Sequence, residues 1–106
     1  MPYTITQHPL VEADLFQIAE VISDFAGLRI GQSKINEITA FIDRLTDFPH
    51  IGSIRSDLYP GLRAIPASEK AVVCFTVDDE AQSVFVLCIS YGRADWQSRV
   101  RERERG

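Results

Sequence analysis

The fold is decided by two apolar runs, AVVCFTV at residues 71–77 and VFVLCIS at residues 84–90. Neither run alternates strictly between apolar and polar residues, as a strand with one solvated face would. We therefore expect both faces of the sheet that they form to need cover. The link between them, DDEAQS at residues 78–83, is short and contains turn-forming aspartates. It predicts that the two strands pair antiparallel.

Ahead of these strands, two segments have the three- and four-residue apolar spacing of amphipathic helices. The first begins near Pro9, and its apolar face comprises Val11, Leu15, Ile18, Ile22 and Phe25. Its acidic residues, Asp14 among them, are expected on the remaining faces. The second runs from about residue 30 to residue 48, and its apolar face comprises Ile35, Ile38, Ile42 and Leu45, widened by Phe41. Gly27 is a plausible end for the first helix, so we expect an antiparallel helical hairpin.

Two shorter strands complete the predicted fold, one at residues 3–7 and one at residues 62–66, with a loop at residues 52–60. The prediction is an α+β domain with an N-terminal strand, an antiparallel helical hairpin and a small antiparallel sheet packed on it. We expect this single domain to span residues 1–98, followed by a charged C-terminal tail at residues 99–106. The tail is expected to be solvated and frayed or weakly helical, or else to serve as a contact arm.

The hairpin can cover only one face of this sheet. For the other face, either the C-terminal segment folds back over it or another chain covers it. We expect a partner to supply at least part of the cover, because exposed apolar patches of this kind usually mark interfaces.

Charge and hydropathy exclude several classes of function. The net charge is −4, and residues 93–106 hold five arginines and three acidic residues, which leaves the rest of the chain strongly acidic. An acidic body opposes binding to phosphate backbones, so we expect no direct nucleic-acid partner. No apolar run approaches the ~20 residues of a membrane span, and the N-terminus lacks the features of a signal peptide. We therefore expect a cytoplasmic protein without a membrane partner.

The cysteines and histidines predict no metal site. Cys74 and Cys88 lie inside apolar strands without metal-ligand spacing, and His8 and His50 are far apart with no cysteine nearby. We expect both cysteines to be buried, reduced thiols. A disulfide would require that the strand register sets them opposite each other, and the turn does not fix that register.

Short motifs in a fixed order point to a family. They are His8-Pro9 ahead of Asp14-Leu15 and Ile18, then Phe48-Pro49-His50-Ile51-Gly52, Pro60-Gly61-Leu62-Arg63 and Tyr91-Gly92-Arg93-Ala94-Asp95-Trp96. From residue 3 to about residue 96, the chain resembles the ParE branch of the RelE/ParE toxins, the toxin components of bacterial type II toxin–antitoxin pairs. Tyr91 departs from the pattern, since ParE-like chains often carry His-Gly there.

The resemblance implies a toxin that acts by binding a protein, DNA gyrase, with no cofactor, no metal and no covalent chemistry of its own. It also implies a ParD-like antitoxin in a hetero-oligomer, and for that interface we expect the exposed sheet face and the helical hairpin. Two alternatives stay open. RelE-type relatives share the fold and cut messenger RNA on the ribosome, and an inactive remnant would only bind its antitoxin.

The candidate site residues lie at strand ends and in the tail. For target binding we expect Arg63, Arg93, Trp96, Arg99 and Arg101. Cleaving RNA through its 2′-hydroxyl needs a proton acceptor, a cation for the phosphate and an acid for the leaving oxygen. Under that alternative the catalytic residues are Arg63, Tyr91 and Arg93.

Three of these residues also have a purely structural interpretation. Arg63 could form an ion pair with Asp57 or Glu69. Tyr91 could cap the core at the end of a strand, and Trp96 could pack over the edge of the sheet, although tryptophan is also a common interface anchor.

Overall fold

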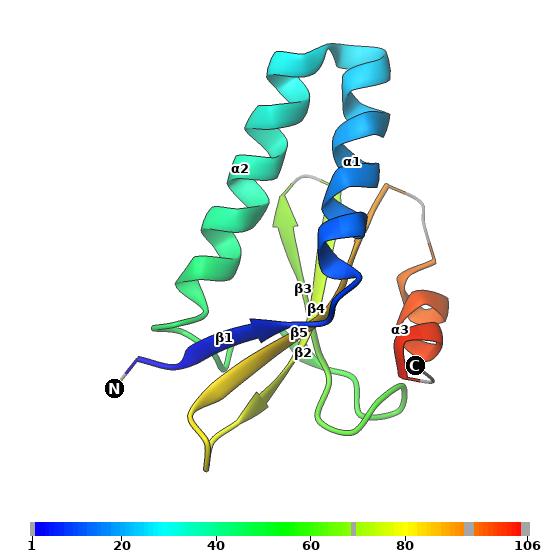
Figure 1. Ribbon diagram of the computed structural model, residues 1–106. Helices are drawn as coiled ribbons and strands as arrows, with labels where there is room; N and C mark the ends of the chain where they lie inside the picture. The colour runs from blue at the N-terminus through cyan, green and yellow to red at the C-terminus, as the bar shows by residue number, and fades with distance from the viewer. Residues whose placement is uncertain (1, 69, 93–94, 105–106) are drawn as a thin grey trace.

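A computed structural model describes residues 2–68, 70–92 and 95–104. Within these residues the chain forms five strands and three helices, in the order β1 (Thr4–Gln7), α1 (Val11–Ala26), α2 (Leu28–Arg44), β2 (Ser53–Ile54), β3 (Arg63–Ser68), β4 (Ala71–Asp78), β5 (Ser83–Tyr91) and α3 (Trp96–Glu104). The strands form one sheet in the order β1-β5-β4-β3-β2, and Figure 1 shows α1 and α2 side by side as a hairpin. The predicted α+β fold is confirmed.

The sheet is mixed rather than wholly antiparallel. β1 pairs in parallel with β5, with Thr4 opposite Ser83, whereas the pairs β2–β3, β3–β4 and β4–β5 are antiparallel. The antiparallel pairing predicted for the two apolar runs is thus confirmed. β2 comprises only Ser53 and Ile54, inside the segment predicted as a loop, because two residues are too few to show the period of a strand.

The hairpin covers one face of the sheet with most of its predicted apolar residues. The buried part of this core comprises Val11, Ile18, Ile22, Ile38, Ile42, Leu45, Ala71, Val73, Phe75, Val84, Val86 and Ile89. Two expectations for α1 were wrong. Phe25 is 69% exposed, because the last turn of α1 extends past the sheet (Figure 1), and Asp14 is only 2% exposed.

Local backbone geometry sets the ends of the two helices. Gly27 joins them with a φ of 96°, a left-handed conformation that glycine adopts readily. α2 ends at Arg44 rather than near residue 48, because the N–H groups of Leu45 and Thr46 bond to carbonyls three residues back. The helices approach closely near Gly31, where an added Cβ would lie 2.3 Å from Ser23 Oγ.

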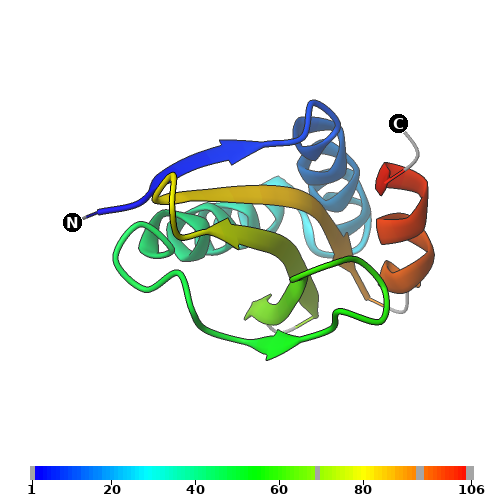
Figure 2. The same cartoon turned by 90° about the horizontal axis from the view of Figure 1, so that it is seen from below.

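The other face of the sheet is partly covered by the C-terminal segment. α3 begins at Trp96 and crosses the boundary expected at residue 98, so residues 99–104 are helical, one of the two forms expected for the tail, but they are packed on the domain rather than solvated. Val100 is fully buried and packs with Leu62, Cys74, Leu87 and Cys88. Figure 2 shows α3 beside α1. Of the two sources of cover that the sequence left open, the structure shows this one.

Candidate functional site

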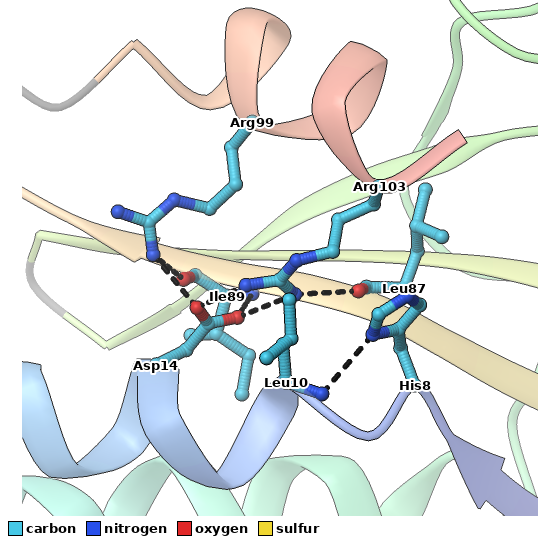
Figure 3. A network of polar contacts seen from close by, with 7 residues as sticks. All are labelled: His8, Leu10, Asp14, Leu87, Ile89, Arg99 and Arg103. Atoms are coloured by element: carbon cyan, nitrogen blue, oxygen red, sulfur yellow. Dashed lines mark hydrogen bonds and ion pairs between the residues drawn. The ribbon is translucent and has the colours of Figure 1, made fainter. Parts of the chain in front are cut away.

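The most constrained polar cluster joins α1 to α3 and consists of Asp14, Arg99 and Arg103, here called the clasp (Figure 3). The Asp14 carboxylate accepts hydrogen bonds from Arg99 Nη1 at 2.8 Å and from Arg103 Nη1 at 2.9 Å, and a further one from Arg103 Nη2. The Arg103 side chain is 8% exposed and the Arg99 side chain 28%. Two guanidinium groups therefore share one buried carboxylate through charge-assisted hydrogen bonds, which are stronger than neutral ones.

The clasp also takes the place of a strand at the edge of the sheet. β1 pairs with only the first part of β5, so the outer edge of β5 lacks a neighbouring strand beyond it. There the Leu87 carbonyl accepts from Arg103 Nη1 at 2.9 Å. The Ile89 carbonyl accepts from Arg99 Nη1 at 3.2 Å, and the Ile89 N–H donates to Asp14 Oδ2 at 3.0 Å. Since a buried backbone group without a partner costs about 1–3 kcal/mol, the clasp stabilises both β5 and the position of α3.

Part of the clasp could have been found in the sequence. Asp14 lies three residues after Val11 and four before Ile18, which places it on the buried stripe of α1. Arg99 and Arg103 are four residues apart and so share one face of a helix. The sequence predicts a target-binding role for Arg99 and none for Arg103, whereas in the structure both guanidinium groups bond to the buried Asp14 carboxylate.

A groove of about 270 Å³ lies over the clasp, between α1 and α3. Besides the clasp residues, its lining comprises His8, Leu10, Ala13, Gln17 and Glu102. Figure 3 shows His8 and Leu10 at one end of the clasp, where the Leu10 N–H donates to His8 Nδ1 at 3.1 Å.

A second contact joins α3 to the loop between β2 and β3, where the Arg55 guanidinium lies over the Trp96 ring. Trp96 is half-buried at the start of α3, and the Arg55 guanidinium carbon lies 5.4 Å from the centre of its ring. Arg55 also donates two hydrogen bonds of 3.1 Å to Asp57, which hold the pKa of the Asp57 carboxyl below its ordinary value. Arg101 is exposed on α3. Of the predicted target-binding residues on α3, Arg101 therefore presents its side chain to solvent, and Trp96 does so in part.

Of the residues expected for RNA cleavage, the two that the structure describes, Arg63 and Tyr91, are not brought together. Arg63 begins β3 opposite Phe75 of β4, whereas Tyr91 ends β5 opposite Ala71 of β4. Phe75 and Ala71 are four residues apart on one strand, which corresponds to about 13 Å along the sheet. Arg93, the third residue expected for RNA cleavage, lies outside the described residues.

Arg63 and Tyr91 each have local structural contacts. Arg63 Nη1 donates to the carbonyl of Ile51 at 3.5 Å, and Asp57, one of its two expected partners, pairs with Arg55 instead. Tyr91 is half-buried and packs against the core under the hairpin. Glu69, the other expected partner of Arg63, lies outside the described residues.

One surface cluster could not be found from the sequence, because its members come from three distant segments. Asp79, in the turn after β4, accepts a hydrogen bond from the Tyr3 hydroxyl at 2.7 Å and lies 2.6 Å from His50 Nε2. The rings of Tyr3 and His50 meet edge to face with their centres 5.8 Å apart. The bonds from Tyr3 and His50 lower the pKa of Asp79, and the bond to Asp79 raises the pKa of Tyr3. This cluster ties the N-terminus to the turn between β4 and β5.

Exposed apolar side chains gather on the hairpin. Among the described residues, six of the eight large apolar side chains that are exposed lie between residues 10 and 30: Leu10, Phe16, Val21, Phe25, Leu28 and Ile30. Phe25 is 69% exposed and Leu28 83%, on either side of the turn at Gly27. Large apolar side chains in water often mark contact surfaces, so these are candidates for contact with another protein.

The part of the chain that the structure describes contains no candidate membrane span and no candidate metal cluster. None of its helices is both long and apolar enough to cross a membrane. Its histidine, cysteine, aspartate and glutamate side chains form no group of three or more that could hold a metal ion.

Comparison with known proteins identifies the family. The family described as the ParE toxin of the type II toxin–antitoxin system parDE matches residues 5–96. The chain belongs to the ParE toxin family. Toxin ParE3 of Caulobacter vibrioides is 36% identical to it over 90 residues, which cover 85% of this chain and 87% of that protein. The predicted membership in the ParE branch is thus confirmed.

Solved toxin structures share the fold of this ParE toxin. A chain of the chromosomal ParDE toxin–antitoxin system from P. aeruginosa gives a TM-score of 0.71 at 18% identity, covering 84% of this chain and 95% of that one. A chain of the toxin–antitoxin complex RelBE2 from Mycobacterium tuberculosis gives 0.66 at 17% identity, covering 87% and 100%. A doubly substituted E. coli toxin RelE in the free state gives 0.67 at 14% identity, covering 98% of both chains.

Proposed function

We propose that this ParE toxin acts by binding DNA gyrase and that a ParD-like antitoxin neutralises it in a hetero-oligomer. The observation that carries the proposal is the match to the ParE family over residues 5–96. The separation of Arg63 from Tyr91 along the sheet supports action by binding over cleavage of RNA. The net charge of −4 supports it too, since binding to nucleic acid depends largely on cationic contacts with phosphates.

For the antitoxin interface we propose the outer surface of the hairpin. The face of the sheet opposite the hairpin, the other expected surface, is already partly covered by α3, whose Val100 is fully buried. The hairpin instead leaves large apolar side chains in water, Leu28 and Phe25 most of all. An apolar side chain that an interface fully desolvates contributes about 1.5–3 kcal/mol, so a few such anchors support tight binding.

For the gyrase interface we propose Arg63, Trp96 and Arg101, together with Arg93. Arg101 is exposed and its guanidinium is available to an acidic partner, whereas Trp96 can act as an anchor with Arg55 over its ring. Arg99 contributes indirectly in this proposal, because its guanidinium holds α3 on Asp14.

The test of the activity is induction of the toxin alone in a bacterial host, with DNA synthesis and protein synthesis followed by pulse labelling. The gyrase proposal expects DNA synthesis to stop first and purified toxin to inhibit supercoiling by purified gyrase. Protein synthesis stopping first would instead establish RNA cleavage on the ribosome. Normal growth together with tight antitoxin binding would establish an inactive remnant.

Two substitutions then separate the interfaces, and each serves as the control for the other. Arg101→Glu is expected to weaken gyrase inhibition at least about tenfold and to leave antitoxin affinity unchanged, because it reverses one exposed charge on α3. Leu28→Ser is expected to do the opposite, because it removes an apolar anchor at the tip of the hairpin. If both variants change both activities equally, the two surfaces are not separate and this assignment is wrong.

A further inference from the structure

The two cysteines of the chain are direct cross-strand neighbours. Cys74 of β4 is opposite Cys88 of β5, and both residues are fully buried. In the same register, the Gly92 N–H donates to the Lys70 carbonyl at 2.9 Å, so these two residues are a hydrogen-bonded pair. Hydrogen-bonded and non-hydrogen-bonded pairs alternate along an antiparallel ladder. Cys74 and Cys88, four residues further along each strand, are therefore also a hydrogen-bonded pair. Such pairs have Cα atoms about 5.5 Å apart, inside the range of about 4.4–6.8 Å that a disulfide spans.

The two thiols differ in their surroundings. The pKa of Cys88 is lowered, chiefly because the Cys74 S–H is placed to donate to the Cys88 thiolate, and Arg103 and Arg99 add smaller effects of the same sign. The pKa of Cys74 is raised, since it keeps its proton in that hydrogen bond and is buried. Cys88 lies between Leu87 and Ile89, whose carbonyls accept hydrogen bonds from Arg103 and Arg99, so two guanidinium charges lie close to its strand position. We therefore assign Cys88 as the nucleophile of the pair and Cys74 as the resolving thiol.

We propose that Cys74 and Cys88 form an oxidation site that a hydroperoxide converts into a cross-strand disulfide. In the first step the Cys88 sulfur attacks a peroxide oxygen and the O–O bond breaks, so that Cys88 becomes a sulfenic acid. The other peroxide oxygen takes up the Cys88 proton and leaves as an alcohol, or as water when the oxidant is hydrogen peroxide. In the second step the Cys74 sulfur attacks the Cys88 sulfur, the S–S bond forms, the S–O bond breaks, and the Cys74 proton leaves in a water molecule. The two thiols lose two electrons, and the peroxide gains them.

The clasp controls access to this site. Cys88 lies between Leu87 and Ile89, whose backbone groups are held by Arg103, Arg99 and Asp14. Val100 of α3 packs in the same cluster as the two cysteines. Peroxide can reach the sulfur only when α3 moves away, and such local opening occurs far more often than global unfolding. Oxidation is thus expected to follow the opening of α3.

The test is treatment of the purified, reduced full chain with hydrogen peroxide, followed by mass spectrometry of the intact protein. The expected product has lost two hydrogen atoms, is monomeric, and no longer reacts with a thiol reagent after unfolding. Cys74→Ser is expected to stop at the sulfenic acid, which dimedone traps on Cys88. Cys88→Ser is expected to react much more slowly. Equal trapping in the two variants, or disulfide formed only between molecules, would overturn the proposal.

A second measurement tests the role of the clasp. Asp14→Asn is expected to speed disulfide formation about tenfold or more, because it weakens the hold on α3, whereas Arg101→Ala, on the exposed side of the helix, leaves the rate unchanged. Arg103→Lys offers a milder change should Asp14→Asn fail to fold. Rates that stay equal in all folded variants would overturn control by α3, and no reaction in any of them would overturn the site itself.

Discussion

Replacing Asp14 with alanine is the sharpest test of how α3 is held on the domain. The substitution leaves two guanidinium groups without their carboxylate and the Ile89 N–H without its acceptor. Arg103 is the more affected arginine, because its side chain is 8% exposed, whereas water can reach the 28% exposed Arg99.

The size of the effect follows from these contacts. Removing one partner of a buried ion pair costs about 3–5 kcal/mol, and leaving a buried N–H unpaired costs about 1–3 kcal/mol. The two effects overlap, and solvation of Arg99 offsets part of the first, so we expect the free energy of unfolding to fall by about 3–5 kcal/mol. A domain of this size has about 5–15 kcal/mol in total, so the loss would be a large fraction of it.

Urea denaturation followed by the fluorescence of Trp96, the one tryptophan of the sequence, measures this change at α3. Glu12→Ala is the matched control, because it removes an exposed carboxylate from the same turn of α1 and should stay within about 0.5 kcal/mol of wild type. An Asp14→Ala variant as stable as this control would refute the argument that the clasp holds α3. Replacing all three clasp residues with apolar ones should recover part of the loss, but not the part due to unpaired backbone groups.

Three further predictions concern single contacts. Gly31→Leu should destabilise the domain by about 1–3 kcal/mol in thermal denaturation, since its Cβ would lie 2.3 Å from Ser23 Oγ and 3.1 Å from the Ala19 carbonyl; an unchanged midpoint would contradict the close packing. Asp95 accepts hydrogen bonds from the Ser98 N–H and hydroxyl, which lower its pKa below 3.8. Its contribution is therefore present at neutral pH and lost as the pH falls through the lowered value. The protection of α3 amides against hydrogen exchange, relative to their intrinsic rate at each pH, should fall there in wild type but not in Asp95→Ala. Trp96→Ala should lower the free energy of unfolding by about 2 kcal/mol, less than the same substitution at a fully buried tryptophan would. Arg55→Ala should lower it by less than Trp96→Ala does.

The helices and the central strands could be predicted because their signals are local. The stripe of Ile38, Ile42 and Leu45 needs only the period of one helix, and the polar link at residues 78–83 needs only a turn between two apolar runs. The pairing of β1 with β5 was beyond such reasoning, because residues some eighty positions apart meet and nothing local specifies the partner. The register that sets Cys74 opposite Cys88 depends likewise on a bulge beside Cys74.

The candidate site was harder to predict because charged side chains are normally exposed to solvent. Asp14 is a charged residue of a type usually found at the surface, but it lies on the apolar stripe of α1. It is buried there because two arginines neutralise its charge. For the same reason, the sequence predicts a solvated tail that contains Arg99 and Arg103. The ion pairs join α1 to α3, so neither segment considered alone shows that the two arginines meet Asp14.

The weak apolar character of α3 explains why one carboxylate matters so much. Trp96 and Val100 are the apolar residues of this helix, too few to hold it on the sheet by burial alone. Its position therefore depends on the hydrogen bonds that the clasp makes to the free edge of β5. Stability, access to the thiols and the shape of the groove between α1 and α3 should consequently change together in Asp14 variants. Substitutions at Leu28, on the far end of the hairpin, should change none of the three, because that side chain contacts solvent rather than α3.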